Sequence, residues 1–170
     1  MHALKLIGAL TAAVLFHLLG MHLVPSFARL VDVFLVVVVV YALEASSLAA
    51  LFAGLAVGLL HDTLTSGPYG LFGFADTIVG YSTARLAQRL VIQRSTGVLA
   101  LVSFAAVAQQ AIVAGLAFLL LPFPELPNPV LVAVQAGLCG VLGMSIHIGT
   151  INWRRSAETR RRGRLSRLRL

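Results

Sequence analysis

Residues 31–43 read VDVFLVVVVVYAL, an apolar stretch in which five consecutive valines follow Phe34 and Leu35. In a soluble protein, a β-branched run of this kind would favour a buried strand. The chain around it is 59% hydrophobic and only 11% charged, whereas about 25% of the residues of a soluble domain are charged. An isolated strand cannot satisfy its backbone hydrogen bonds in lipid, so the run is expected to form a helix. The sequence thus predicts an all-α integral membrane protein.

Six apolar stretches of the chain are candidates for transmembrane helices, each of which needs about 20 apolar residues to span the bilayer. Pro25 and Ser26 end the first, the turn-forming segment DTLTSGPYG follows the third, and the proline-rich segment PFPELPNP follows the fifth. We expect one transmembrane domain over residues 1–153 and a disordered, Arg-rich cytoplasmic tail over residues 154–170. The six expected spans cover residues 3–24, 27–43, 46–61, 71–90, 96–121 and 130–153.

The net charge of +7 lies entirely in the tail. Residues 1–153 carry five basic and five acidic side chains, whereas the last 17 residues carry eight arginines and one glutamate. These arginines lack the interleaved aromatic side chains of proteins that bind single-stranded nucleic acid, so no nucleic-acid partner is expected. With both termini in the cytoplasm, 12 of the 13 basic residues lie on the cytoplasmic side, and the positive-inside rule predicts that orientation.

A cytoplasmic basic cluster follows from this orientation. Its side chains are expected to fix the topology and to adhere to anionic lipid, and a specific lipid or protein contact is the alternative explanation. The members of the cluster are Arg85, Arg89, Arg94, Arg154, Arg155, Arg160, Arg161 and Arg162.

Small residues and one carboxylate recur every four residues in the third span, at Ala50, Gly54, Gly58 and Asp62. Stripes of this kind allow two helix backbones to approach closely in lipid. Packing against another helix of the same chain is the simpler explanation, and contact with another membrane protein is the functional one.

Two polar positions could carry chemistry. His61 and Asp62 could form a proton relay or a cation site, or Asp62 could instead hydrogen-bond the turn that follows it. Asp76 lies inside the fourth span, where a carboxylate is costly unless it is paired, and we expect a structural contact with Gln109 or Gln110 of the fifth span. The sequence contains no nucleophile, metal-ligand or phosphate-binding motif, so no catalytic residue, metal or cofactor is expected.

The segment from Val31 to Leu90 resembles the rod shape-determining MreD family of bacteria. The resemblance rests on the Asp-bearing stretch VDVFLVVVVVYAL, on the Gly-rich segment AGLAVGLLHDTLTSGPYGLFGF and on the Gly-Tyr pair in IVGYSTARL. The family pattern, G-x-x-x-G-L-x-x-D followed by S-G-x-x-G-L, is matched at Gly54, Gly58, Leu59, Asp62, Ser66, Gly67, Gly70 and Leu71.

The resemblance implies a non-enzymatic scaffold of the cell-wall elongation machinery, located in the bacterial cytoplasmic (inner) membrane, that helps to maintain rod shape. Its main expected partner is the bitopic protein MreC, and the MreB filament, RodA and the elongation transpeptidase are expected in the same complex. On this interpretation, the motif residues help to shape the MreC-binding surface, together with the small-residue stripe that begins at Ala50.

The MreD family is also similar in fold to the substrate-binding S-components of energy-coupling-factor transporters, so a vitamin-transporter subunit is the alternative function. In that case, the helices would enclose an outward-opening pocket in which Asp62 or Asp76 touches the ligand. A vitamin site needs several convergent polar groups, and the outer loops offer few. The sequence therefore favours the scaffold.

Overall fold

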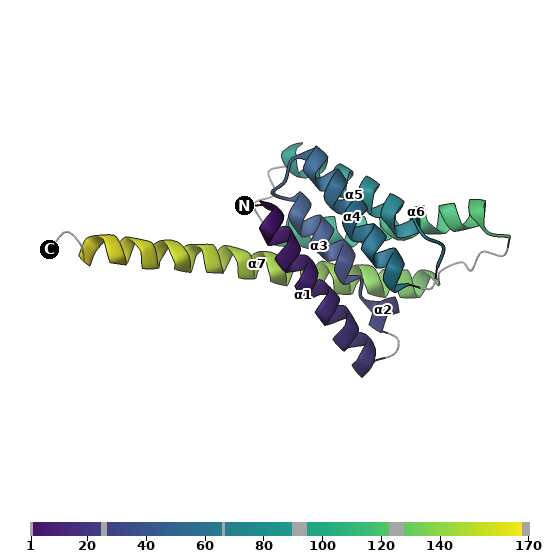
Figure 1. Cartoon of the computed structure of the whole chain (residues 1–170), viewed down its shortest axis with the longest axis horizontal. Helices are drawn as coiled ribbons and strands as arrows, with labels where there is room; N and C mark the ends of the chain where they lie inside the picture. The colour runs from purple at the N-terminus through teal and green to yellow at the C-terminus, as the bar shows by residue number, and fades with distance from the viewer. Residues whose placement is uncertain (1, 25–26, 66, 90–94, 123–127, 168–170) are drawn as a thin grey trace.

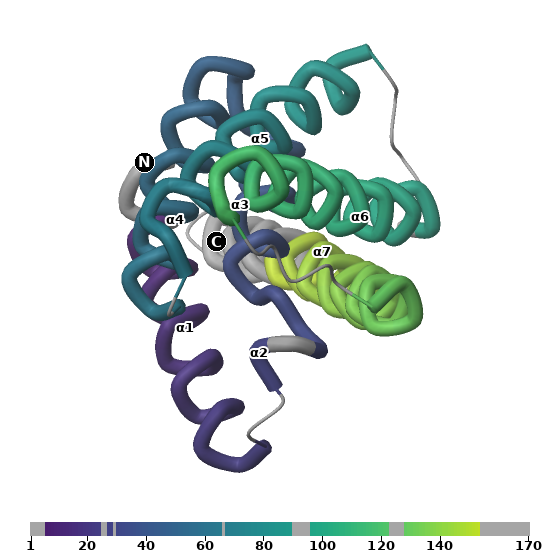
Figure 2. The backbone as a smooth tube through the Cα atoms, turned by 90° about the vertical axis from the view of Figure 1, so that its right-hand side faces the viewer, coloured from purple at the N-terminus to yellow at the C-terminus, as the bar shows by residue number. Residues whose placement is uncertain are grey.

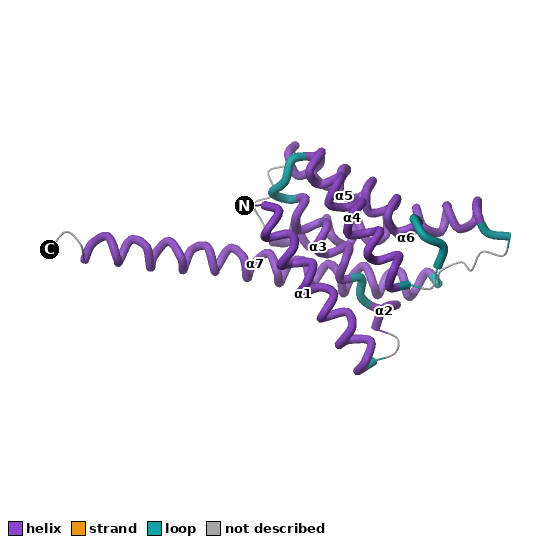
Figure 3. The backbone as a smooth tube through the Cα atoms, viewed as in Figure 1, coloured by secondary structure: helices purple, strands orange, loops and turns teal. Residues whose placement is uncertain are grey.

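Helices form all the regular secondary structure in the described part of the chain, as Figure 3 shows. The computed structural model describes residues 2–24, 27–65, 67–89, 95–122 and 128–167. The valine run is helical, which confirms the prediction of an all-α protein. The helices are α1 (His2–Leu23), α2 (Phe27–Leu30), α3 (Val33–Ala42), α4 (Ser47–Leu64), α5 (Leu71–Arg89), α6 (Ser95–Leu120) and α7 (Pro129–Arg167).

Four of these helices contain a stretch that is long and apolar enough to cross a membrane, so the chain is a membrane protein. The other two expected spans differ from these four. α3 has ten residues, which corresponds to about 15 Å of rise, and α5 is long enough but more polar. The four stretches are Leu6–Leu23 in α1, Ser47–Leu64 in α4, Thr96–Leu120 in α6 and Pro129–Trp153 in α7.

The second expected span, residues 27–43, is not one continuous helix, and this prediction is wrong. The helical conformation is interrupted at Val31 and Asp32, and Asp32 becomes the N-cap of α3 with φ −97° and ψ 93°. Its Oδ1 atom accepts a hydrogen bond from the backbone N–H of Leu35 at 2.9 Å. Aspartate is a favoured N-cap because its side chain satisfies a free amide of the first turn. This local preference outweighs the apolar continuity of the stretch.

The short helix α3 lies at the centre of the bundle, and the longer helices surround it (Figure 2). Seven of its ten residues are buried. On one side, Leu35 and Val39 pack in a buried cluster with Val102 of α6. On another side, Phe34 packs with Val57 of α4. A helix that is buried on several sides has no need of a polar face, which explains the uninterrupted run of valines.

The most extensive helix contact in the described part of the chain is between α4 and α5, and it is built on the small-residue stripe. A Cβ atom on Gly58 would lie 2.5 Å from the carbonyl oxygen of Phe72 and 2.7 Å from the Cα atom of Gly73. A Cβ atom on Gly54 would collide with the backbone carbonyl group of Asp76. Only glycine allows the two backbones to approach this closely.

The stripe is therefore used for packing within the chain. Ala50, Gly54, Gly58 and Asp62 are all buried. These four residues are not on a surface that another protein can reach, so they are not available as the partner contacts that the functional interpretation assigned to them.

α7 continues well beyond the last expected span. The sequence predicts a span that ends near residue 153 and a disordered tail, whereas the helix continues to Arg167 and projects from the bundle (Figure 1). Extending an existing helix requires far less free energy than starting one, and the Arg, Ala, Glu and Leu residues that follow Trp153 are good helix formers. The projecting part of α7 and the start of α1 lie at the same end of the bundle (Figure 1).

We expect Gly58→Ala to destabilise the protein more than Gly67→Ala does. The added methyl group at position 58 pushes α4 and α5 apart, at a cost of about 1–3 kcal/mol, whereas a Cβ atom on Gly67 meets no atom within 4 Å. Thermal unfolding in detergent should show a Tm loss of roughly 2–12 °C for Gly58→Ala alone. Equal Tm values for the two variants would contradict the close approach of the helices.

Candidate functional site

Asp62 holds the turn between α4 and α5. Its carboxylate accepts hydrogen bonds from the backbone N–H groups of Gly70 at 3.0 Å, Phe72 at 3.0 Å and Gly73 at 2.9 Å. Amides at the start of a helix lack intrahelical acceptors and carry the positive end of the helix dipole, so a carboxylate stabilises them. Both oxygens of Asp62 are occupied, and its side chain is buried. The interpretation in which Asp62 hydrogen-bonds the turn is confirmed.

The glycine- and aspartate-bearing motif of residues 54–71 coincides with this helical hairpin. Its two α4 glycines provide the close approach to α5, and its aspartate caps α5. Gly70 has a φ of 97°, a left-handed conformation that glycine adopts without strain. Leu71 is buried at the start of α5, whereas Gly67 is exposed. Ser66 lies outside the described residues.

Asp62→Ala should destabilise the protein by about 3 kcal/mol or more, because three backbone N–H groups lose a charged acceptor. Asp62→Asn should cost less, since one acceptor oxygen remains. The exposed neighbour Thr63 provides the control, and Thr63→Ala should stay within about 0.5 kcal/mol of the wild type. Equilibrium unfolding in mixed detergent micelles measures all three. The capping role would be refuted if Asp62→Ala were as stable as Thr63→Ala.

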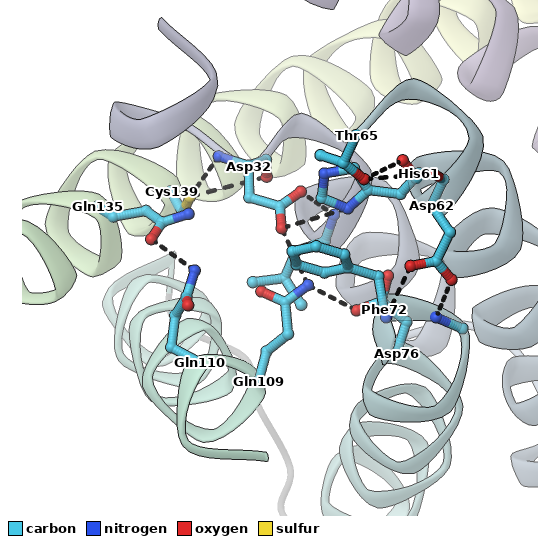
Figure 4. A network of polar contacts seen from close by, with 12 residues as sticks. Asp32, His61, Asp62, Thr65, Phe72, Asp76, Gln109, Gln110, Gln135 and Cys139 are labelled. Carbon is cyan, nitrogen blue, oxygen red and sulfur yellow. Dashed lines mark hydrogen bonds and ion pairs between the residues drawn. The ribbon is translucent and has the colours of Figure 1, made fainter. Parts of the chain in front are cut away.

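A second set of polar side chains lies in the interior and connects several helices (Figure 4). We call Asp32, His61, Asp76 and Gln109 the polar core. The Nε2 atom of Gln109 donates hydrogen bonds to Asp32 Oδ2 at 2.9 Å and to Asp76 Oδ1 at 2.7 Å. Asp76 and Gln109 are fully buried, at 0% exposure. The expected structural contact of Asp76 with Gln109 is confirmed.

Gln110 has a different partner. Its Nε2 atom donates to Gln135 Oε1 of α7 at 2.9 Å. Successive residues of a helix project in directions about 100° apart, so Gln109 faces α5 while Gln110 faces α7. The two adjacent glutamines thereby link α6 to α5 and to α7.

Asp32 belongs to the polar core, and the sequence interpretation missed it as a site residue. Besides capping α3 and accepting from Gln109, its Oδ2 atom lies 3.8 Å from His61 Nδ1. Its backbone N–H donates to Cys139 Sγ at 3.3 Å, and the Cys139 thiol donates to the Asp32 carbonyl oxygen at 3.7 Å. Asp32 therefore connects α3, α4, α6 and α7. Its signal in the sequence is a single aspartate directly before an apolar helix.

His61 faces Asp32 and not its acidic neighbour in the sequence, so the adjacent pair does not form the relay that the sequence suggested. Its ring stacks on Phe34 with 4.8 Å between centroids, and its centroid lies 4.1 Å from that of Phe72. His17 of α1 is next, with its ring centroid 6.3 Å from that of His61. Both nitrogens of the His17 ring are buried without a hydrogen-bond partner.

Several buried atoms of the polar core lack a hydrogen-bond partner. Asp76 Oδ2 and Gln109 Oε1 have no donor, and His61 Nδ1 has the ion-pair contact with Asp32 alone. Buried polar groups in native proteins are nearly always hydrogen-bonded. Within the described ranges, no group of three or more His, Cys, Asp or Glu side chains is arranged to hold a metal ion.

A groove with a volume of about 1210 Å³ lies between α1 and α7, with α3 as its floor. Its walls are formed by small residues of α1, valines of α3 and aliphatic side chains of α7, among them Gly8, Ala9, Ala12, Val36, Val40 and Ile146. α1 contributes one aromatic lining residue, Phe16. The other polar and aromatic lining residues come from the end of α3, the residues just after it and the last part of the apolar stretch of α7, and they are Tyr41, Glu44, His147, Thr150 and Trp153.

The basic cluster is described in part. Arg85 and Arg89 are exposed near the end of α5. Arg85 Nε donates to the hydroxyl of Tyr81 at 3.1 Å, and its guanidinium carbon lies 5.6 Å from the ring centroid. The lipid contact of the cluster stays a prediction. Arg94 lies outside the described residues. The structure describes only the backbone at the other members of the cluster, which are Arg154, Arg155, Arg160, Arg161 and Arg162.

No protein-family model matches the chain, and neither a curated protein nor a solved structure matches it.

Gln109→Leu should destabilise the protein by about 3 kcal/mol or more, because two buried carboxyl groups lose the donor that they share. Gln110→Leu provides the matched control, since it removes one partly buried hydrogen bond and should cost about 1–2 kcal/mol. Equilibrium unfolding in mixed detergent micelles measures both. A smaller loss for Gln109→Leu than for Gln110→Leu would contradict the structural role of the polar core.

Proposed function

We propose that the chain is a member of the rod shape-determining MreD family and acts as a non-enzymatic scaffold of the cell-wall elongation machinery. In this role, it binds MreC and helps to maintain rod shape, together with MreB, RodA and the elongation transpeptidase. The family-like motif supports the proposal, because its residues cap, bend and bring together one helical hairpin. The observation that carries it is the groove between α1 and α7.

The groove suits a single transmembrane helix. Gly8 and Ala12 are exposed and lie one helical turn apart on its α1 wall. A Cβ atom added to Gly8 would meet no atom within 4 Å, so packing within the described chain does not require glycine there. Small residues at this spacing let a second helix backbone approach closely. MreC is bitopic, and its one membrane helix is the segment that we assign to the groove.

The orientation belongs to the same proposal. We place the protein in the bacterial cytoplasmic (inner) membrane with both termini in the cytoplasm. This placement agrees with the common end of the bundle at which α1 begins and α7 projects (Figure 1), and with the positive-inside rule. The Arg-rich end of α7 is then on the side of MreB and of anionic lipid headgroups.

The alternative is an S-component-like subunit of a vitamin transporter. Such a site needs several polar groups that converge inside an apolar pocket. The polar core is packed with side chains, and Asp76 and Gln109 have no exposed surface for a ligand. The groove is open, but most of its lining is apolar. Both features favour the scaffold.

Co-purification with MreC tests the proposal. Ala12→Leu fills the groove, whereas Ala100→Leu adds the same atoms to another exposed position, on α6. We expect Ala12→Leu to lower the recovery of full-length MreC at least tenfold, a loss of about 1.4 kcal/mol in binding free energy, and Ala100→Leu to leave it unchanged.

Equal recovery of MreC with both variants would exclude the groove as the binding site. Failure of the wild-type protein to retain MreC, together with a stoichiometric small molecule in the purified sample, would overturn the scaffold in favour of the transporter subunit.

A further inference from the structure

The polar core contains two carboxyl groups that share one hydrogen-bond donor. Asp32 Oδ2 and Asp76 Oδ1 both lie within 3 Å of the Nε2 atom of Gln109, at 2.9 and 2.7 Å. Asp32 is 3% exposed and Asp76 is 0% exposed. Two carboxylates this close repel each other strongly where water cannot screen them.

The charged and titratable groups around this pair come from five elements. His17 lies on α1, Asp32 at the start of α3, His61 and Asp62 on α4, Asp76 on α5 and Cys139 on α7, while α6 contributes the uncharged Gln109. Within the described residues, the basic group in ion-pair range is His61, 3.8 Å from Asp32. Asp62 is directed to the backbone amides of the α5 turn. The two carboxyl groups therefore have one imidazole in ion-pair range, and its contact is with Asp32.

Two acceptor atoms at the same place lack a donor. Asp76 Oδ2 and Gln109 Oε1 are both buried and unpartnered. The orientation of the Gln109 amide follows from its neighbours, since its NH₂ group must face the two carboxyl groups. Its oxygen is then left without a donor. A fully ionised polar core would keep both acceptors unsatisfied, which is costly in a protein interior.

We propose that the polar core is a proton-binding site and that its resident proton is held on the carboxyl group of Asp76, beside the Asp32–His61 contact. The proton comes from bulk water. Its binding forms one O–H bond at the Asp76 carboxyl group, breaks no bond within the protein and removes one of the two adjacent negative charges. The hydroxyl supplies the donor that this region lacks.

The side chains around the site favour a site that binds a proton but does not conduct it across the protein. One side of the site faces the end of the bundle at which α1 begins. On that side, α3, α5 and α6 contribute aliphatic side chains, and Val36, Val79 and Val102 belong to one buried cluster. On the other side of the Asp32–His61 contact lies the His17 ring, 6.3 Å from that of His61. Imidazoles can pass protons on, whereas aliphatic side chains cannot. Imidazole rings therefore lie on one side of the site, and a cluster of aliphatic side chains lies on the other.

Asp76→Asn tests the proposal, because asparagine keeps the shape of a protonated aspartate and its NH₂ group can take the place of the hydroxyl. Near neutral pH, the folded wild-type protein holds a proton at Asp76, whereas the unfolded chain does not. The free energy of unfolding therefore falls as the pH rises, and the equilibrium constant of unfolding increases by up to tenfold per pH unit. We expect Asp76→Asn to remove this component of the pH dependence between pH 6 and 9. Asp62→Asn should retain it, at a lower overall stability.

Infrared spectroscopy provides a second readout that does not depend on a stable variant. The full-length wild-type protein in detergent at pH 7 should show the carbonyl stretch of a protonated carboxylic acid, which Asp76→Asn should lack and Asp62→Asn should retain. A wild-type spectrum without this band would overturn the proposal. A band that persists in Asp76→Asn, or an equal pH slope in that variant, would also overturn it.

Discussion

A carboxylate inside a membrane protein depends on donors from the chain itself, because lipid supplies none. Asp32, Asp62 and Asp76 meet this constraint in three ways: by capping a helix, by binding three amides of a turn and by sharing a glutamine. Each solution requires two or more elements to lie at fixed positions. The arrangement of α3 to α6 around one another is therefore dictated by three acidic side chains as much as by the valines that fill the space between them.

Much of this arrangement is visible in the sequence where the relevant partners are close together. The glycine spacing in α4 predicts a close helix contact, and the aspartate before a Ser-Gly-Pro turn predicts a cap, because both depend on local geometry. The pairing of Asp76 with a glutamine of the fifth span was also foreseeable, since an intramembrane carboxylate needs a donor at similar depth. The sequence pattern does not show whether Gln109 or Gln110 binds Asp76, because that depends on the rotation of α6 about its axis.

The break before α3 and the partner of His61 illustrate the limits of local reasoning. Residues 27–43 contain no glycine or proline, so an apolar pattern predicts one helix. The competing preference of Asp32 for an N-cap is satisfied because Cys139 and Gln109, both far away in the sequence, bind the same residue. His61 and the following aspartate are adjacent in the sequence but project in different directions from one helix, which prevents them from facing each other.

The helical continuation of α7 changes what the Arg-rich end of the chain can do. From Trp153 to Arg167 the helix adds 14 residues, or about 21 Å along its axis. Electrostatic attraction to a charged membrane decays over about 8 Å at physiological ionic strength. In the orientation that we propose, the projecting part of α7 acts as a spacer: its first turns lie within the field of the lipid headgroups, and its far end lies beyond that field.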